Sequence, residues 1–309
     1  MSDFFSSGWA IFIAAITIAG MAFCVFVLVV ASRRTVMSAE DNTTGHVWDG
    51  NLQELNNPLP RWWMWLFIIT IVFSAVYLVL YPGLGVYQGK WGWSQVGQYN
   101  AEVEKAKVQL EPLYAQFTSK DAAQLALDSQ AMGIGERLFV NNCAQCHGSD
   151  ARGSKGFPNL TDGDWLYGGE HETIKQTIAN GRTGVMPPMA AAVGSAEDVR
   201  NLAHYVLSLS GSAHNSIAAQ LGKPKFAACA ACHGADGKGN QAMGAPNLTD
   251  KVWLHGWGEQ AIVSVITNGK NNMMPAHAHK LTEPQIHVLA AYVWNLSNTT
   301  QTAQAGSSK

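Results

Sequence analysis

Two copies of the motif C-x-x-C-H are the residues in this sequence best suited to chemistry. The first copy is Cys143, Cys146 and His147, and the second is Cys229, Cys232 and His233. Two thiols at this spacing lie on one helical turn and can add to the two vinyl groups of haem, while the adjacent histidine can bind the iron. The motifs therefore predict two covalently bound haem c groups, each with its histidine as an axial ligand.

The sequence around each motif is repeated. A chance match or half of a zinc site could explain one C-x-x-C-H motif. However, GERLFVNNCAQCHGSDARGSKGFPNLTD aligns with GKPKFAACAACHGADGKGNQAMGAPNLTD, and both copies continue through a tryptophan, an Asn-Gly pair and Met-Pro. The sequence thus contains two copies of one module, which we place at residues 130–212 and 213–300, followed by a tail at residues 301–309.

A haem iron that exchanges electrons without binding substrate needs a sixth ligand, and a methionine thioether raises its potential by favouring ferrous iron. Met186 and Met274 each precede a proline at the same place in the two repeats. This is where class I cytochromes c carry their distal methionine. We predict that these two residues are the distal axial ligands.

Other residues near the two Met-Pro pairs could take this role. His277 or His279 could bind the second iron in place of Met274, although the first repeat has no histidine at the matching loop position. Met189 and Met273 are better explained as packing residues, because methionine is a common gap filler. Met243 is more consistent with packing against a haem face than with binding the iron.

Helical patterns surround the motifs, and we expect no strand of useful length. Each module has an amphipathic stretch entering its motif, a second helix ending at Asn-Gly and a third with apolar residues three and four apart. Tyr205 and Tyr292 correspond in the third helices, where we expect them to pack the C-terminal helix on the N-terminal helix. Trp165, Trp253, Asn159 and Asn247 also repeat, and either packing and turn formation or hydrogen bonds to haem propionates would explain them.

Two long apolar runs precede the modules, at residues 9–31 and 62–81. The first would span about 34 Å as a helix, enough for a hydrocarbon core of about 30 Å. A cleaved signal peptide is a poorer explanation, since the run is too long and MSDFFSSG has no basic residue. We predict two membrane helices within an anchor at residues 1–95, followed by a helical connector at residues 96–129.

The basic residues near these helices predict their orientation. Arg33, Arg34 and Arg61 lie in the connecting loop at residues 32–61, whereas Lys90 is the first basic residue after the second helix. The positive-inside rule makes the loop cytoplasmic. Both termini and both haem modules are then periplasmic.

Composition narrows the function. The 309 residues carry a formal charge of −2 with 14% charged residues, which gives no indication of nucleic-acid binding. No nucleophile with a base and no phosphate loop is visible, and neither apolar run contains a histidine. We predict an all-α protein with two transmembrane helices and two class I cytochrome c domains in tandem, whose role is to pass electrons.

The loop between the apolar runs, GHVWDGNLQELNNPLPRWW, adds a specific likeness. Together with two spans and two haem motifs, it resembles the membrane-anchored dihaem subunit of cbb3-type cytochrome c oxidase, called CcoP or FixP. The resemblance covers essentially the whole chain. Asn51 stands where isoleucine is common in that family.

The resemblance implies a bacterial inner-membrane subunit that is not itself catalytic. Reduced periplasmic cytochrome c would give electrons to its haems, which would pass them through a monohaem subunit to a catalytic haem-copper subunit that reduces oxygen and pumps protons. The loop would dock on a partner subunit, since Pro58 and Pro60 restrict its backbone and Trp48 offers a rigid apolar group. Contact with membrane lipid alone is the alternative.

Two other functions fit the haem motifs. The cytochrome subunit of a periplasmic dehydrogenase would also carry haems on a membrane anchor, but such subunits commonly lack the WDG and ELNNPLP segment. A gas sensor would release one methionine from its iron. The order of the haems, their potentials, the donor cytochrome and the role of the first helix do not follow from the sequence.

Overall fold

The computed structural model describes residues 6–33, 43–57 and 59–307. Arg34 and Pro58, which entered the arguments on orientation and loop conformation, lie outside these residues. The chain divides into two compact units, residues 1–108 and 109–309. Helices dominate both units, which confirms the predicted fold class, and the described strands form two short antiparallel pairs.

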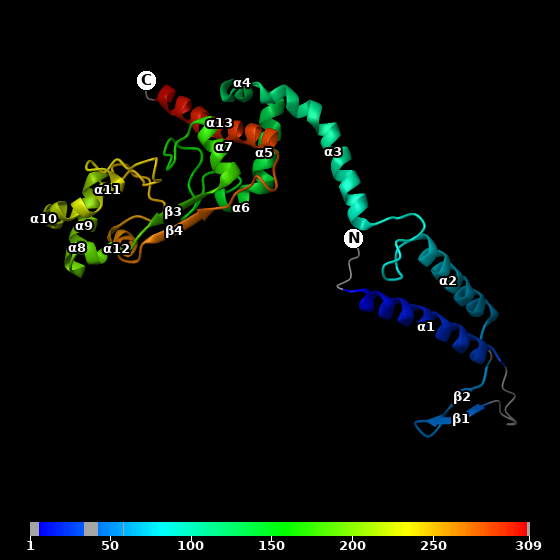
Figure 1. The fold of residues 1–309 in the computed structure, drawn as a ribbon. Coiled ribbons are helices and arrows are strands. Elements are labelled where there is room, and N and C mark those ends of the chain that lie inside the picture. Colours follow the sequence, from blue (N-terminus) through cyan, green and yellow to red (C-terminus); the bar gives the residue numbers. More distant parts are fainter. Residues whose placement is uncertain (1–5, 34–42, 58, 308–309) are drawn as a thin grey trace. The chain divides into compact units, whose positions relative to one another are not determined.

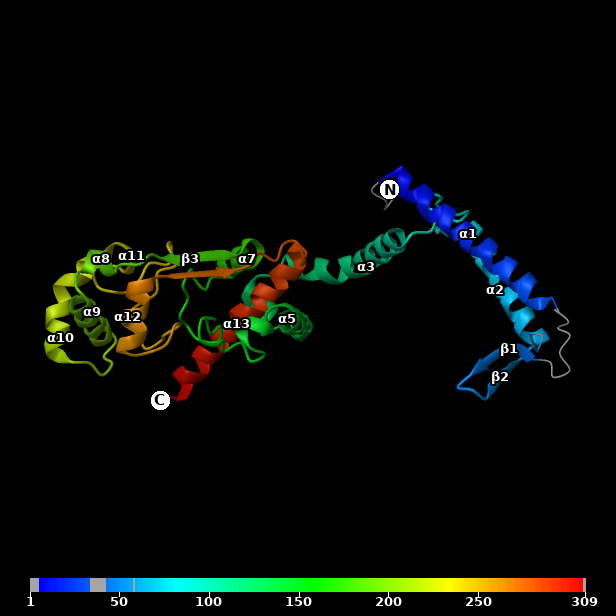
Figure 2. The same cartoon turned by 90° about the horizontal axis from the view of Figure 1, so that it is seen from below.

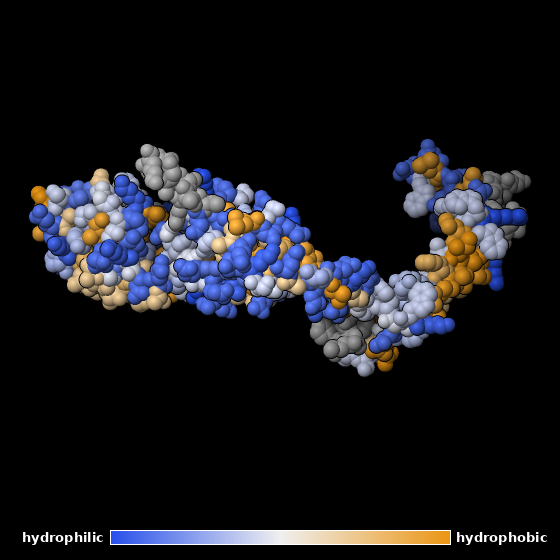
Figure 3. Space-filling view, turned by 90° about the horizontal axis from the view of Figure 1, so that it is seen from above, coloured by the Kyte–Doolittle hydropathy of each residue, from blue (hydrophilic) through white to orange (hydrophobic). Residues whose placement is uncertain are grey.

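Two long apolar helices lie in the first unit. Helix α1 (Ser7–Ser32) buries only Ala10 of its residues, and α2 (Arg61–Leu80) buries none. Their apolar side chains therefore form an exposed hydrophobic surface (Figure 3). Both helices are long and apolar enough to cross a membrane, and their bounds agree with the predicted spans to within two residues.

A β-hairpin lies between the two helices in the sequence. Strand β1 (Thr43–Trp48) pairs with β2 (Leu52–Leu55) through an Asp49-Gly50 turn in which both residues have positive φ. The Trp48 indole nitrogen donates to Glu54 Oε1 at 2.9 Å and fixes the side chain across the hairpin. We did not expect this hairpin, although Asp-Gly between apolar residues favours such a turn.

The segment after α2 folds back on the end of that helix. The backbone N–H groups of Lys90 and Trp91 donate to Val79 and Leu80, whose carbonyl groups lie in the last turn of α2. The Tyr81 and Trp91 rings pack edge to face, with centroids 4.9 Å apart. These contacts satisfy carbonyl groups that a helix end leaves free. The predicted connector helix then follows as α3 (Gln95–Thr118), which includes residues of both units.

The second unit contains two lobes. The first lobe consists of α4 (Ala122–Ala126), α5 (Ser129–Asn142), α6 (Ala144–His147), α7 (His171–Asn180) and α13 (Glu283–Ser307). The second lobe consists of α8 (Ala190–Val193), α9 (Ala196–Leu209), α10 (Ser216–Gly222), the 3-10 helix η1 (Lys223–Ala228), α11 (Ala230–His233) and α12 (Glu259–Asn268). Each lobe has its own apolar core.

The C-terminal helices of the two sequence repeats are exchanged between the lobes. Helix α13 of the second repeat packs on α4, α5 and α7, while α9 of the first repeat packs on α10, η1 and α12. Tyr292 lies on Phe139 of the first repeat, and Tyr205 lies on Phe226 of the second. The two tyrosines join a C-terminal helix to an N-terminal segment as expected, but each contact is made with the other repeat.

Strands β3 (Arg182–Met186) and β4 (Lys270–Met274) carry the chain from one lobe to the other. They pair antiparallel, with Arg182 opposite Met274 and Met186 opposite Lys270, and join the two lobes in both views of the fold (Figures 1 and 2). Gly181 has a φ of 72°, and a Cβ atom there would collide with the carbonyl oxygen of Met274. The crossing therefore requires glycine at this position.

Candidate functional site

Each C-x-x-C-H motif occupies a single helical turn. Cys143 directly follows the last residue of α5, and the His147 backbone N–H donates to the Cys143 carbonyl at 3.0 Å. Cys229 directly follows the last residue of η1, and His233 makes the same bond to Cys229 at 3.0 Å. Helical packing thus presents two thiols and one imidazole on the same short turn in both lobes, as the motif spacing predicted.

A proline carbonyl orients each motif histidine. His147 Nδ1 lies 3.0 Å from the Pro158 carbonyl oxygen, and His233 Nδ1 lies 3.0 Å from that of Pro246. A carbonyl group only accepts hydrogen bonds, so Nδ1 carries the proton and Nε2 keeps its unshared pair. Burial lowers the pKa of His147 and outweighs the bond to Pro158, which raises it. Such a neutral, oriented imidazole is suited to binding iron.

The four motif cysteines form no disulfide. Burial, with a smaller contribution from Cys146, raises the pKa of the Cys143 thiol to about 11. Burial followed by the neighbouring Cys232 also raises the pKa of Cys229. Cys143 and Cys229 are therefore protonated thiols, the form that adds across a vinyl double bond.

Because β3 and β4 cross between the lobes, each of the two predicted methionine ligands lies in the lobe that holds the cysteine motif of the other repeat. Met274, from the second repeat, packs against the first-lobe core, and so does Cys143. Met186, from the first repeat, ends β3 next to Gly269, where α12 of the second lobe ends. Each cysteine motif therefore shares its lobe with the methionine of the other repeat, a pairing that the sequence did not predict.

The competing ligand candidates occupy different environments. Met273 is 73% exposed, so it does not fill a gap in the core, and His279 and Met243 are also exposed. Met189 packs on the second-lobe core. His277 belongs to the first lobe, where its backbone N–H donates to the Ile178 carbonyl, and so it does not lie in the lobe of the second motif.

Buried polar atoms test whether these lobes suit haem. Trp253 Nε1 is buried and has no hydrogen-bond partner among the described residues, and the same is true of His277 Nδ1. Trp253 packs on the second-lobe core, and so does Cys229. A buried N–H group requires an acceptor, and a haem propionate would supply one. The thiol pairs, the oriented imidazoles and this unpaired donor all fit a covalently bound haem.

The repeated asparagines have a local structural role. Asn159 Oδ1 accepts hydrogen bonds from the backbone and hydroxyl of Thr161, and Asn247 makes the same pair of bonds with Thr249. These bonds close turns after the prolines that orient the histidines. Of the two explanations considered for these asparagines, turn formation is the one that the contacts support.

Three aspartates from the two repeats interact in the loops beyond these turns. Burial raises the pKa of Asp164 to about 6, with further contributions from Asp250 and Asp162. Burial also raises the pKa of Asp162. The sequence alone did not mark this cluster, because its members come from loops of both repeats.

Sequence comparisons agree with this architecture. Residues 40–88 match the family described as the N-terminal domain of cytochrome oxidase-cbb3, FixP. Residues 130–206 and 222–293 match the family described as cytochrome c oxidase, cbb3-type, subunit III. The two separate matches confirm the tandem modules of cytochrome c type.

Individual relatives extend the likeness over the full chain. A cbb3-type cytochrome c oxidase subunit CcoP from Rubrivivax gelatinosus is 65% identical over 303 residues, which cover 98% of this chain and 99% of that protein. A subunit FixP from Sinorhizobium medicae is 41% identical over 272 residues, covering 82% and 93%. A subunit CcoP from Cereibacter sphaeroides is 37% identical over 276 residues, covering 83% and 95%.

Proposed function

Because the chain belongs to the CcoP/FixP family of cbb3-type cytochrome c oxidase subunits, we propose that it is the electron-input subunit of its oxidase and holds two haem c groups. It is a membrane-anchored subunit of an oxidoreductase complex, and its cytochrome c modules give it an electron-transfer role. The observation that carries the proposal is the 65% identity over 98% of the chain. Oxygen reduction takes place on another subunit.

The proposed haem ligands follow from the two lobes. Cys143 and Cys146 hold the first haem and Cys229 and Cys232 hold the second, with His147 and His233 as proximal ligands. Met274 completes the first site and Met186 the second. Met274 and Cys143 pack against the same core, which supports Met274 at the first haem. Met186 takes the equivalent place at the end of the paired strand β3, which supports Met186 at the second haem.

The protein groups have separate tasks in electron transfer. Haem iron supplies reversible one-electron exchange. The proline carbonyl groups fix the imidazole orientation, the thioether side chains would favour ferrous iron, and the lobe cores would keep water from a bound haem. With a histidine and a methionine on each iron, no position would be left for a substrate, which is why we assign no catalytic step to this chain.

The direction of electron flow follows from the proposed orientation. Arg33 and Arg61 flank the hairpin segment, which supports a cytoplasmic loop and periplasmic haem lobes. Electrons then enter from a periplasmic cytochrome c and leave through a monohaem subunit towards the catalytic haem-copper subunit. The protein resides in a bacterial inner membrane.

The hairpin supplies a docking surface for a partner subunit. The apolar side chains of Val47, Trp48, Leu52 and Leu55 are all exposed on this short element. The bond from Trp48 to Glu54 holds the indole in place before any partner binds. A rigid aromatic group loses little conformational entropy on binding, which favours it as an interface anchor.

The test is cyanide-sensitive oxygen uptake by the complex isolated through a tag on this chain in mild detergent. We expect uptake driven by reduced cytochrome c, together with the absorption of b-type haem. A double variant, Cys143→Ser with Cys146→Ser, should lose uptake from cytochrome c but keep it when a small reductant feeds the catalytic subunit directly. Loss of both activities in an intact complex would contradict the non-catalytic role.

A further inference from the structure

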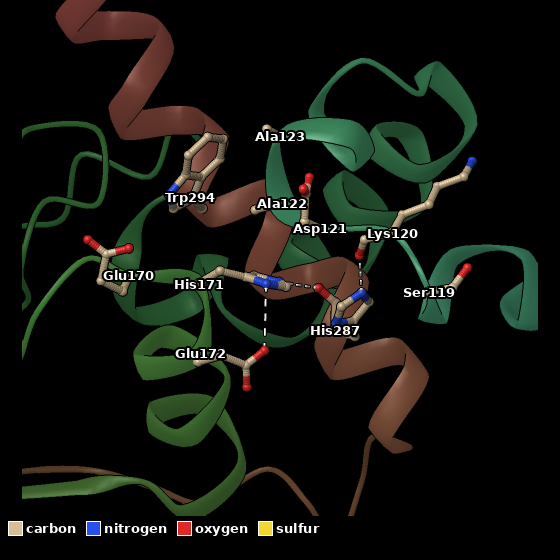
Figure 4. Close-up of a pocket in the computed structure, with 10 residues that line it drawn as sticks. All are labelled: Ser119, Lys120, Asp121, Ala122, Ala123, Glu170, His171, Glu172, His287 and Trp294. Carbon is tan, nitrogen blue, oxygen red and sulfur yellow. Dashed lines mark hydrogen bonds and ion pairs between the residues drawn. The ribbon is translucent and has the colours of Figure 1, made fainter.

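Two histidines and a glutamate meet in the first lobe, outside the two cysteine motifs. His171 begins α7, Glu172 follows it, and His287 lies on α13 (Figure 4). One ligand atom from each residue lies within 4.8 Å of the other two. The three side chains border an open cavity of about 510 Å³ that Asp121 and Glu170 also line.

Backbone carbonyl groups orient both imidazoles. His171 Nε2 lies 3.0 Å from the carbonyl oxygen of His287, and His287 Nε2 lies 2.9 Å from that of Lys120. Each Nε2 must therefore carry the proton, which leaves the unshared pair on Nδ1 of both rings. Metal-binding histidines characteristically donate their second ring N–H in this way. The arrangement supplies two oriented imidazole donors without further change of tautomer.

The surroundings suit a cation. His171 Nδ1 lies 3.9 Å from Glu172 Oε1, so an imidazole nitrogen and a carboxylate oxygen already face each other. The carboxylates of Asp121 and Glu170 add negative charge at the cavity. Two lysines lie nearby. Lys120 Nζ is paired with the Asp128 carboxylate at 2.7 Å. Lys175 Nζ contacts the Glu172 carboxylate at 3.0 Å, and it would share that carboxylate with a bound ion.

The second lobe shows that the fold does not require this cluster. By the repeat alignment, Glu259 replaces His171, Gln260 replaces Glu172 and Arg200 replaces His287. There, α9 and α12 pack through the apolar core of the lobe, and a polar contact between them joins His204 Nε2 to Glu259 Oε2 at 3.3 Å. Two elements of the same kind thus pack together without a set of two imidazoles and a carboxylate.

We propose that His171, Glu172 and His287 bind one divalent transition-metal ion of the zinc or copper type. Both histidines bind through Nδ1 and the glutamate through its carboxylate, while water from the cavity completes the coordination. Two imidazoles and one carboxylate suit such ions better than magnesium or calcium, which favour oxygen ligands alone. The ion links α7 to the exchanged helix α13 and so stabilises the first lobe.

The test uses the full-length, haem-loaded chain in detergent, carrying an affinity tag without histidine. Calorimetric titration with Zn²⁺ should show one site per chain. Cu²⁺ bound to the same site should give an electron paramagnetic resonance signal split by two imidazole nitrogens, and Zn²⁺ should abolish this signal. His287→Gln and Glu172→Gln should each weaken Zn²⁺ binding at least tenfold, whereas the exposed control His214→Gln should bind as the unaltered chain does.

Either of two results would overturn the proposal. One is the absence of stoichiometric Zn²⁺ binding by the unaltered chain, and the other is unchanged affinity in the ligand variants. Glu172 is largely exposed, so its variant keeps the fold and the test holds even where His287→Gln disrupts α13. An unchanged haem absorption spectrum identifies variants whose lobes are intact.

Discussion

The ring of Tyr292 packs on Phe139 with centroids 5.8 Å apart, although the two residues belong to different sequence repeats. Gly135, one turn before Phe139, permits this approach because a Cβ atom there would lie 2.5 Å from Cβ of Tyr292. Phe226 and Tyr205 form the corresponding contact in the second lobe, at 5.4 Å. Neither repeat therefore contains a complete lobe, and the axial ligands are predicted to cross with the helices.

Replacement of Met274 tests this crossed ligation. Met274→His should lower the potential of the haem bound to Cys143 and Cys146 and leave the other haem unchanged, because imidazole favours ferric iron more than a thioether does. The shift should lie well within the range of about 0.8 V that axial ligands span. Redox titration is done on chains that carry a single haem, after Cys-to-Ser replacement of one motif.

Met186→His is the matched variant and should affect only the haem at Cys229 and Cys232. A shift of that haem by Met274→His would instead show that each repeat supplies its own distal ligand. Unchanged potentials in both variants would indicate that other residues bind the irons.

Gly181→Ala should destabilise the haem-loaded chain by more than about 2 kcal/mol. Positive φ alone costs a residue with a Cβ atom about 1 to 2 kcal/mol, and here the added carbon also meets the Met274 carbonyl. Denaturant unfolding measures the difference. Gly211→Ala is the control, since Gly211 has a similar φ of 66° but open space around the added atom. If Gly181→Ala and Gly211→Ala lowered the free energy of unfolding equally, the strand crossing would not be as tight as we infer.

Much of this architecture follows from local sequence signals. Apolar length predicted α1 and α2, and the motif spacing predicted that Cys143 and His147 share a turn. Repeat alignment also indicated that Tyr205 and Tyr292 lie in equivalent cores. These features depend on residues close in sequence, or on patterns that each repeat carries by itself.

The exchange could not be predicted in the same way. Periodicity shows which face of a helix is buried, but α9 and α13 present similar apolar faces, so either could pack on either partner. The cluster of His171 and His287 was missed for a related reason, because 116 residues separate them and no short spacing links them. The hairpin at Asp49-Gly50 did carry a local signal, because Asp-Gly readily takes the positive φ angles that its turn requires.

Asp164→Asn should stabilise the chain above about pH 6, with the gain disappearing towards pH 4. The pKa of Asp164 is raised from 3.8 to about 6 in the fold. A carboxyl group with a raised pKa stabilises the fold below its unfolded pKa and loses that contribution as pH rises through the folded pKa. We expect the free energy of unfolding to rise by about 1 kcal/mol. This is less than the pKa shift of Asp164 would give by itself, because solvent screens the charge of a half-exposed group.

Thermal unfolding at several pH values measures this effect. Asp150→Asn, at an exposed position that keeps its acceptor for the Arg152 backbone, should show no comparable gain at neutral pH. A gain from Asp164→Asn that is the same at pH 4 and pH 7 would exclude the electrostatic cause.

Trp48→Ala should weaken association with the other oxidase subunits while both haems remain attached. The exposed indole is the largest apolar group on the hairpin, and loss of an interface anchor of this kind typically costs about 2 kcal/mol or more. Co-purification measured against haem content reports the change. Trp257→Ala serves as the control, because that indole is 60% exposed compared with 58% for Trp48 and lies in the second lobe. Equal recovery of the complex in both variants would remove the docking role.

Trp253→Phe should lower the potential of the haem at Cys229 and Cys232. Its buried Nε1 has no partner among the described residues, and a propionate that loses this donor holds its negative charge closer to full strength, which favours ferric iron. Phenylalanine retains most of the packing on the second-lobe core, so the unfolding temperature should change little compared with Trp253→Ala. A potential that stays constant in Trp253→Phe while stability falls would show that the indole acts by packing alone.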